Sequence, residues 1–222
     1  IFNEISKLRK IKKYDIVIDI QNLIKSAIIA RLIPSGRTIG LDKNSSREGI
    51  ASIFYSEKYS VEHSINVISR NISIINKALK MQIVNEDINS KSPFLFFNDI
   101  SFSELISNTK PNVLLIPGAS FESKMYPADK YAQLSKKINA NFIVLWGSPI
   151  ERKIAQKIKL LSPQVSLTSK LSIDNLKALI SYVNLVIGSD TGPVHMAWGL
   201  NKASITLFGS TPGYRNSFVT NI

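Results

Sequence analysis

The sequence predicts an α/β fold built from two Rossmann-like halves, in which parallel strands alternate with crossover helices. Three observations predict it. Short apolar runs recur along the chain, amphipathic helical patterns separate them, and 222 residues of which 44% are hydrophobic can bury a sizeable core. Alternation of this kind is typical of parallel sheets that are covered by helices on both faces.

The first half, residues 1–100, shows this alternation incompletely. We expect a strand at 14–20, a helix at 22–33 that ends before Pro34, a strand at 37–41 and a long helix within 61–80. Apolar residues recur in that last stretch at spacings of three and four, at Ile65, Ile68, Ile72, Ile75 and Leu79. This periodicity indicates an amphipathic core helix rather than a coiled coil.

The second half, residues 112–222, repeats the alternation more completely. We expect strands at 112–116, 141–146, 164–167, 184–188 and 204–209. We expect a helix at 126–138, with Pro127 near its start, and a second helix at 150–161. A third helix is expected to begin after Ser172, which can cap it, and a fourth is expected at 192–200. The stretch 92–112 breaks the pattern, and we place a linker at 101–111 within it. Two such halves facing each other would form a cleft, with ligands beyond the carboxyl ends of the strands.

The composition excludes several classes of protein. The absence of cysteine excludes a disulfide framework and a thiolate metal site, and only two histidines, His63 and His195, are available as nitrogen ligands. We therefore expect no metal site. No apolar run reaches the roughly 18 residues that a membrane span needs, and no signal peptide precedes the first strand, so we expect a soluble protein.

The formal net charge of +12 limits the classes of binding partner that we expect. A strongly basic protein attracts nucleic acid, an anionic membrane surface or phosphorylated substrates. Neither an RNA-binding aromatic motif nor a zinc-finger spacing is present, which argues against nucleic acid. The densest basic run, "KLRKIKK" at 7–13, is interpreted as the solvated face of a helix, with a membrane-surface role as the alternative.

The triplet Asp190-Thr191-Gly192 has the sequence of an aspartic protease motif. That interpretation is disfavoured, because such proteases need a β-rich fold and a second carboxylate that shares a proton, whereas here the triplet follows a predicted parallel strand and opens a helix. Free backbone N–H groups and the helix dipole make such a turn an anion site. The alternative is that Asp190 only caps the helix.

Two further strand ends point to a nucleotide diphosphate. In the loop 116–127, small residues expose backbone amides around Ser120, and Lys124 can reach a phosphate. After the next strand, Glu151 either accepts hydrogen bonds from a ribose or is a first-turn helix acid. Neither a Walker loop nor a G-x-G-x-x-G turn follows any strand, so ATPase and dinucleotide oxidoreductase functions are disfavoured.

Several stretches together resemble the ADP-heptose:lipopolysaccharide heptosyltransferases of glycosyltransferase family 9. They are "DIQNLIKSAIIARL", "SSREGIASIFY", "PGASFESKMYP", "WGSPIER" and "GSDTGPVHMAWGLNKASITLFGSTPGYR", and the second is most similar to the type I members. The resemblance implies a GT-B fold and inverting transfer of heptose from ADP-heptose to a Kdo residue of Kdo-lipid A. It also implies a peripheral location on the cytoplasmic face of the inner membrane and no obligatory cofactor, with Mg²⁺ as a stimulant at most.

The resemblance also assigns residues. Those that match the donor side are Ser120, Lys124, Glu151, Asp190, Thr191, Gly192 and His195, and those that match the acceptor side are Arg47 and His63. Each of three has a structural alternative: His195 could brace its helix against the sheet, Arg47 could pair with Glu48 or Asp42, and His63 could be structural. Ala119 stands where the family often has a hydroxyl residue.

The chain departs from the family pattern at both ends. The family's N-terminal strand and glycine-rich turn carry the presumed general base, which we therefore expect upstream of Ile1, and the family continues into further helices beyond Ile222. We expect an incomplete N-terminal domain and no transfer by this chain alone. The alternatives are a GT-B transferase that uses another nucleotide sugar, and a non-catalytic module that binds a nucleotide or a lipid surface.

Overall fold

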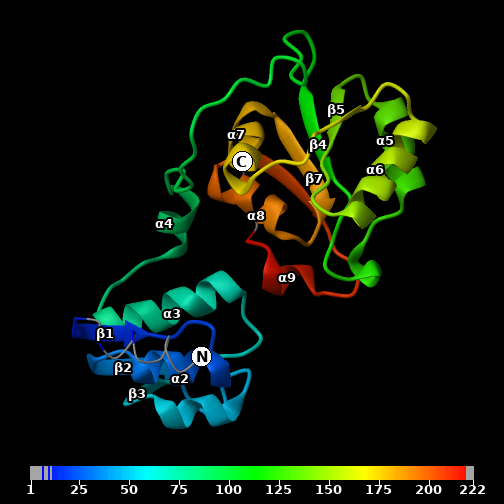
Figure 1. Cartoon of the computed structure of the whole chain (residues 1–222). Helices are drawn as coiled ribbons and strands as arrows, with labels where there is room; N and C mark the ends of the chain where they lie inside the picture. The colour runs from blue at the N-terminus through cyan, green and yellow to red at the C-terminus, as the bar shows by residue number, and fades with distance from the viewer. Residues whose placement is uncertain (1–6, 8–9, 11, 219–222) are drawn as a thin grey trace. The chain divides into compact units, whose positions relative to one another are not determined.

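The computed structural model describes residues 7, 10 and 12–218, and they form two compact units (Figure 1). The described residues of Ile1–Ser90 and Tyr214–Val219 make up the first unit, and those of Lys91–Gly213 the second. The basic run at 7–13 lies largely outside the described residues. Each unit has its own parallel sheet, as the sequence predicts.

The first unit holds a three-stranded parallel sheet in the order β1-β2-β3. Its elements are β1 (Tyr14–Ile18), α2 (Ile24–Leu32), β2 (Ser35–Leu41), η1 (Gly49–Phe54), β3 (Glu57–Tyr59), α3 (Val67–Leu79) and α4 (Asn85–Asn89). The strands and helices predicted for this half are confirmed in type. The long helix begins only at Val67, because Asn66 accepts the amide N–H of Ile68 at 2.8 Å and caps it.

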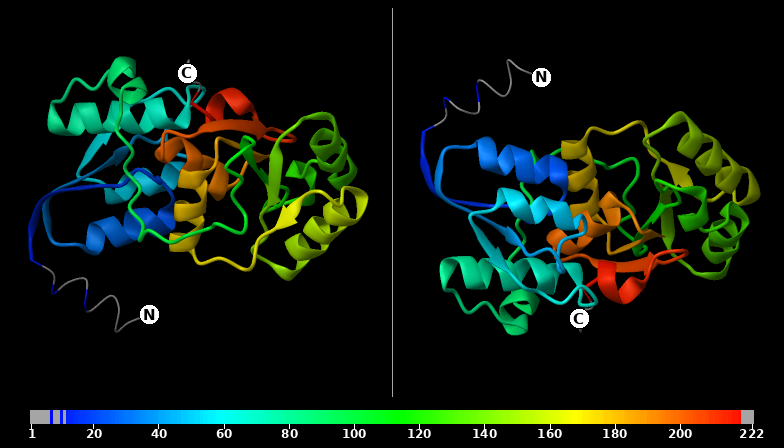
Figure 2. Two further views of the ribbon diagram at one scale, coloured as in Figure 1. Left: turned by 90° about the horizontal axis from the view of Figure 1, so that it is seen from above. Right: turned by 90° about the horizontal axis from the view of Figure 1, so that it is seen from below.

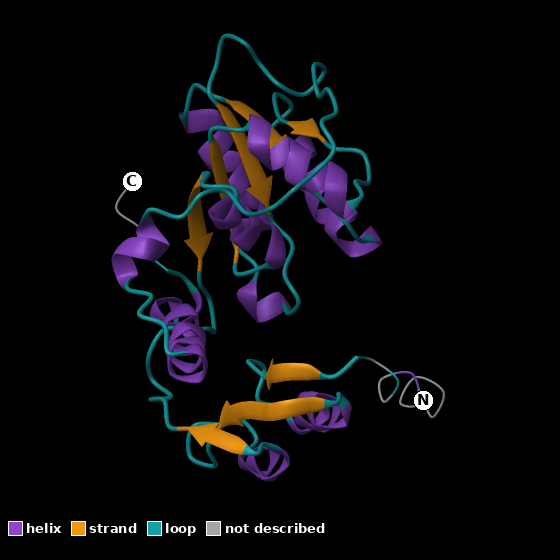
Figure 3. Cartoon of the chain, turned by 90° about the vertical axis from the view of Figure 1, so that its left-hand side faces the viewer, coloured by secondary structure: helices purple, strands orange, loops and turns teal. Residues whose placement is uncertain are grey.

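Helices cover both faces of this sheet, since side chains along a strand point alternately to either side. Ile39 and Leu41 pack against Ile74 of α3. Gly40, between them, faces the opposite side, where a Cβ atom would lie 2.2 Å from the ring of Tyr55. That second face is covered by α2 and η1 (Figure 3). Leu79, which the sequence placed in the apolar stripe of α3, is exposed.

The second unit holds a five-stranded parallel sheet in the order β6-β5-β4-β7-β8. The strands are β4 (Asn112–Ile116), β5 (Asn141–Val144), β6 (Ser166–Leu167), β7 (Leu185–Ser189) and β8 (Ala203–Leu207). The helices are η2 (Glu122–Lys124), α5 (Ala128–Lys137), α6 (Pro149–Leu161), α7 (Ile173–Tyr182), α8 (Gly192–Gly199) and α9 (Gly213–Asn216). The predicted strands and helices of this half are confirmed, with shifts of a few residues at their ends.

Two hydrophobic cores lie on the two faces of this sheet. Leu114 and Ile116 of β4 pack with α7 and α8, whereas Val113 and Leu115 pack with α5 and α6. Figures 1 and 2 show the resulting three layers, with α7 and α8 on one side of the sheet and α5 and α6 on the other. Ser172 caps α7 as predicted, because its Oγ accepts the amide N–H of Asn175 at 3.1 Å.

The segment that precedes β4 is part of the second unit and packs against one of its two cores. Phe102, Leu105 and Ile106, within the range 101–111 that the sequence assigned to a linker, contact the core under α7 and α8. Before them, Lys91 Nζ lies 4.3 Å from the ring centroid of Trp198 and donates to its carbonyl at 2.6 Å. Among the described helices, none is both long enough and apolar enough to cross a bilayer.

Candidate functional site

The sheet of the second unit has a switch point between β4 and β7. The chain builds outward from β4 through β5 to β6, and then returns to place β7 on the other side of β4. In open parallel sheets, ligands bind at such a point, beyond the carboxyl ends of the strands. The loop 117–127 leaves β4 there and the turn at 190–191 leaves β7, so the fold brings the two predicted donor loops together.

Asp190 is the centre of a polar cluster at this edge. Its Oδ2 lies 3.0 Å from Lys124 Nζ and accepts the hydroxyl of Thr211 at 3.2 Å. Its Oδ1 lies 3.2 Å from His195 Nε2. The side chains of Lys124 and Asp190 are only 19% and 9% exposed, so this is a partly desolvated ion pair rather than a surface contact.

The pKa of Asp190 reflects these contacts. Burial by itself raises the pKa of the carboxyl, since it penalises the charged form. The hydrogen bond and positive charge of Lys124, followed by the hydrogen bonds of Thr211 and His195, outweigh burial and hold the pKa below its usual value. Asp190 is therefore ionised at neutral pH and keeps the ammonium group of Lys124 at the switch point.

The structure argues against one interpretation of Asp190, that of a helix cap. Helix α8 has Thr191 as its N-cap, and no side chain makes a capping hydrogen bond there. Asp190 is thus not the helix cap, because its carboxylate is directed to Lys124, His195 and Thr211. A Cβ atom on Gly192 would meet nothing within 4 Å, so the space in front of the helix start is open. Its N–H groups can face a ligand there.

His195 lies one turn into α8 with its side chain 49% exposed. It contacts the carboxylate of Asp190 rather than packing between the helix and the sheet. This contact links α8 to the turn after β7, so the bracing role and the ligand-binding role both stay open.

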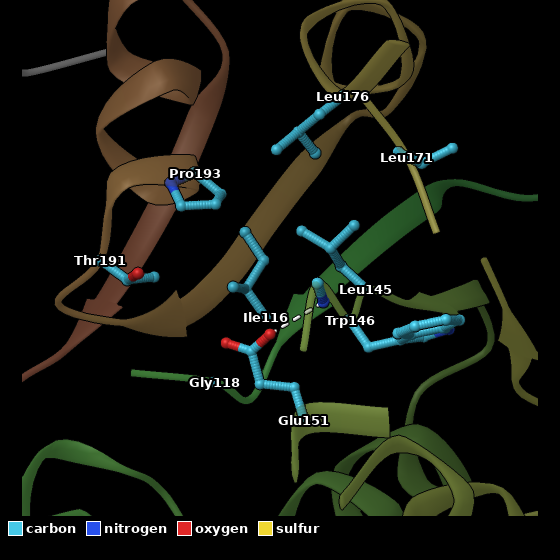
Figure 4. Close-up of a pocket in the computed structure, with 10 residues that line it drawn as sticks. Ile116, Gly118, Leu145, Trp146, Glu151, Leu171, Leu176, Thr191 and Pro193 are labelled. Atoms are coloured by element: carbon cyan, nitrogen blue, oxygen red, sulfur yellow. Dashed lines mark hydrogen bonds between the residues drawn. The ribbon is translucent and has the colours of Figure 1, made fainter. Parts of the chain in front are cut away.

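Figure 4 shows a small cavity that is lined in part by Thr191, the residue after Asp190. Its volume is about 150 Å³, and its lining residues are Ile116, Gly118, Leu145, Trp146, Gly147, Glu151, Leu171, Leu176, Thr191 and Pro193. Apolar side chains from β4, the end of β5 and α7 form one wall, and Glu151 and Thr191 supply polar groups. Pockets that enclose a whole small-molecule ligand measure about 300–1,000 Å³. This cavity therefore suits one part of a nucleotide rather than all of it.

Glu151 is the first-turn acid of α6, one of the two roles that the sequence left open, and its role toward a ribose stays a prediction. Its Oε2 accepts the amide N–H groups of Gly147 and Ser148, each at 2.8 Å, so it closes a capping box at the start of α6. Its Oε1 faces Gly118, where a Cβ atom would lie 2.1 Å from that oxygen. Figure 4 shows one carboxylate oxygen bonded to the backbone and the other directed into the cavity. Glycine at 118 leaves the room that this carboxylate needs.

Sequence reasoning missed a third loop at this edge. Besides Thr211, which bonds to Asp190, Ser210 lies with its Oγ 3.3 Å from that of Ser123. A Cβ atom on Gly209 would lie 2.5 Å from the carbonyl oxygen of Ser123, so this glycine permits the close approach. The position of this loop in the sequence could have revealed it, because the loop follows β8, the next strand of the same sheet. Ser120 is exposed on the loop after β4.

The two predicted acceptor residues belong to the first unit. Arg47 is exposed, and none of the salt bridges between described residues pairs it with Glu48 or Asp42. Glu48 Oε2 accepts the amide N–H of Ile24 at 2.7 Å, and Asp42 Oδ1 accepts that of Ser45 at 2.8 Å. His63 is also exposed. Its pKa is lowered, first by desolvation and then by the charges of Arg215 and Arg70.

The described residues contain no group of three or more histidine and carboxylate side chains placed to hold a metal ion. The independence from a metal that the sequence suggested stays a prediction.

The family model of glycosyltransferase family 9 (heptosyltransferase) matches residues 4–218 of the chain. Over 94% of this chain and 65% of the relative, the sequence is 34% identical to lipopolysaccharide heptosyltransferase 1 of Campylobacter coli. It is 25% identical to the protein of the same name from Escherichia coli strain K12, over 95% of this chain and 66% of that protein. The chain thus spans about two thirds of the length of these relatives.

Solved structures share the fold. E. coli heptosyltransferase WaaC with ADP superposes with a TM-score of 0.75 at 23% identity, over 96% of this chain and 65% of that one. E. coli ADP-heptose lps heptosyltransferase II gives a TM-score of 0.64 at 17% identity, over 96% of this chain and 68% of that one. The predicted GT-B type of α/β fold is confirmed by these likenesses.

Proposed function

This chain belongs to glycosyltransferase family 9, and we propose that it supplies the donor site for transfer of heptose from ADP-heptose to a Kdo residue of Kdo-lipid A. The observation that carries the proposal is the Lys124–Asp190 ion pair at the switch point, next to the cavity that Glu151 lines. The names of its relatives, and the ADP with which one structural neighbour was solved, support the choice of donor.

The residues at this edge suit a sugar nucleotide diphosphate. An ammonium group has three N–H donors, and Asp190 takes one from Lys124, which leaves two for phosphate oxygens. The open start of α8 adds backbone N–H groups and the positive end of a helix dipole. Ser120 is exposed on the loop that carries Lys124. Together these groups stabilise the charge that develops on ADP as it leaves.

The cavity suits the nucleoside part of the donor. Glu151 Oε1 is the acceptor for ribose hydroxyl groups, and the apolar wall of Leu145, Leu171 and Leu176 is the surface for the base. In the inverting reaction, a general base deprotonates the Kdo hydroxyl, which attacks the anomeric carbon from the face opposite ADP. The location of this base upstream of Ile1 stays a prediction from the sequence.

The net charge of +12 suits an acidic acceptor at a membrane surface. Each basic residue near an anionic leaflet contributes about 1 kcal/mol to attraction. We propose a peripheral location at the cytoplasmic face of the inner membrane, where Kdo-lipid A and anionic lipids both carry negative charge.

Calorimetric titration of the chain with ADP, UDP and GDP tests the donor assignment. ADP is expected to bind, and more tightly than UDP or GDP. Equal binding of UDP would redirect the proposal to a transferase that uses another nucleotide sugar. Absence of binding by all three nucleotides would overturn it.

A further inference from the structure

Three segments that are distant in sequence meet at the start of α3 in the first unit. Ser45, in the loop that carries Arg47, accepts the amide N–H of Val61 on its Oγ at 2.9 Å and a guanidinium N–H of Arg70 on its carbonyl oxygen. Asn66, the N-cap of α3, donates from its Nδ2 to the carbonyl oxygens of Tyr214 and Ser217, at 2.9 and 2.8 Å. The last described segment of the chain is thereby attached to the beginning of α3.

This arrangement gathers three basic side chains, those of His63, Arg70 and Arg215. Arg70 lies on the first turns of α3, and Arg215 lies within the segment that Asn66 holds. The pKa of Arg70 is lowered, first by desolvation and then by the charge of Arg215. The pKa of His63 is lowered by desolvation and by the charges of Arg215 and Arg70. The backbone agrees with this grouping, because His63 and Arg70 flank the N-cap Asn66 in the sequence and the hydrogen bonds of Asn66 bring the segment of Arg215 to the same end of α3.

No carboxylate balances this charge among the described residues. None of the salt bridges between described residues involves His63, Arg70 or Arg215. Glu62, next to His63, accepts the hydroxyl of Ser64 instead. Arg70 Nε is buried and has no hydrogen-bond partner, although a guanidinium has five N–H donors. Grouped like charges and an unpaired buried donor both cost free energy unless an anion compensates them.

We propose that His63, Arg70 and Arg215 form an oxyanion site that binds an acidic group, a carboxylate or a phosphate, of the acceptor. The N-terminal end of the 13-residue helix α3 adds its positive dipole to the three side chains. The choice of the acceptor as the ligand rests on the proposed function. The existence of the anion site does not, since it follows from the charge cluster of the first unit alone.

The test is a titration of the chain with two probes, inorganic phosphate and free Kdo, which has a carboxylate and no phosphate. Affinity is measured by calorimetry, and occupation of the site by the shift of the His63 ring signals in NMR spectra. At least one probe is expected to bind, and the tighter of the two identifies the acidic group. Arg70→Gln and Arg215→Gln are each expected to weaken that probe about tenfold or more, as for loss of a charged hydrogen bond.

Arg31→Gln is the matched control, because Arg31 is exposed at the end of α2, on the opposite face of the sheet from α3. It removes the same charge and is expected to leave the affinity within about twofold. Arg70→Gln also removes the bond to Ser45, so thermal unfolding checks its fold. Arg215→Gln tests the site independently, since the hydrogen bonds that hold its segment to Asn66 come from backbone carbonyls and not from the Arg215 side chain.

The outcomes separate this inference from the proposed function. ADP binding depends on the second unit, and it is expected to be the same in Arg70→Gln, Arg215→Gln and the parent chain. If ADP binds but neither phosphate nor Kdo does, or if the variants bind the probes as the parent chain does, the oxyanion site is overturned and the donor site stands. If the probes bind as expected and ADP does not, the proposed function fails and the anion site remains.

Discussion

Lys124 Nζ lies 3.0 Å from Asp190 Oδ2, and this ion pair joins the loop after β4 to the turn after β7. The two strands are neighbours in the sheet, although the chain forms two other strands between them. The pair therefore marks the switch point of the sheet with one positive and one negative charge. A diphosphate that binds there meets an ammonium group already held in place.

Lys124→Ala is expected to weaken ADP binding by about 1.5–3 kcal/mol, the range for a hydrogen bond to a charged group. Calorimetry on the chain measures the change. Lys130→Ala, an exposed lysine on α5, is the control and should leave the dissociation constant unchanged. An unaltered affinity in a folded Lys124→Ala variant would remove Lys124 from the site.

Asp190 is expected to make stability depend on pH in the acid range. Its pKa in the folded chain is below the ordinary value of 3.8, so its contribution is present above that value and is lost as the pH falls through the folded pKa. The free energy of unfolding in urea, measured at pH 7 and again below the ordinary pKa, should therefore differ less in Asp190→Asn than in the parent chain. Asp15→Asn, an exposed aspartate, should keep the parent difference. Equal pH dependence in Asp190→Asn and the parent chain would contradict the ion pair.

Glu151→Gln and Glu151→Ala are expected to separate capping from ligand binding. Glutamine keeps an oxygen that can accept from Gly147 and Ser148, whereas alanine removes the capping box. Alanine should therefore destabilise the fold by about 0.5–2 kcal/mol, the usual cost of a lost cap, and glutamine by less. Thermal unfolding measures this difference. Both variants should weaken ADP binding. Normal ADP binding by Glu151→Ala would restrict Glu151 to its capping role.

Gly118→Ala and Gly192→Ala form a matched pair at the donor site. The added methyl at 118 would lie 2.1 Å from Glu151 Oε1 and must displace that carboxylate, whereas at 192 it meets no atom within 4 Å. We expect Gly118→Ala to weaken ADP binding about tenfold, as for a lost charged hydrogen bond, while Gly192→Ala keeps the stability of the parent within about 0.5 kcal/mol. Titration with ADP and urea unfolding measure the two effects. Unchanged ADP affinity in Gly118→Ala would show that the position of Glu151 does not matter for the ligand.

The type and order of the longer strands and helices in both units could be predicted from the sequence, whereas β3 and the short helices η1, α4, η2 and α9 were not predicted. Strands such as Asn112–Ile116 and helices such as Pro149–Leu161 follow from local apolar periodicity and local caps, which do not depend on distant residues. The sequence also predicted that Lys124 and Asp190 share one edge, because parallel strands present their carboxyl ends together.

The contacts of each polar group depend on residues that are distant in the sequence. From the local sequence, Asp190 could equally have capped the helix that follows it. Its carboxylate instead contacts Lys124 and Thr211, which lie in the loops after β4 and β8. The packing of Phe102 and its neighbours on the core beneath α7 and α8 could not be predicted either, because the apolar character of a residue does not specify its partner. The same holds for the cluster of His63, Arg70 and Arg215. The sequence shows that these side chains are basic, but only the fold determines whether a carboxylate lies close enough to balance their charge.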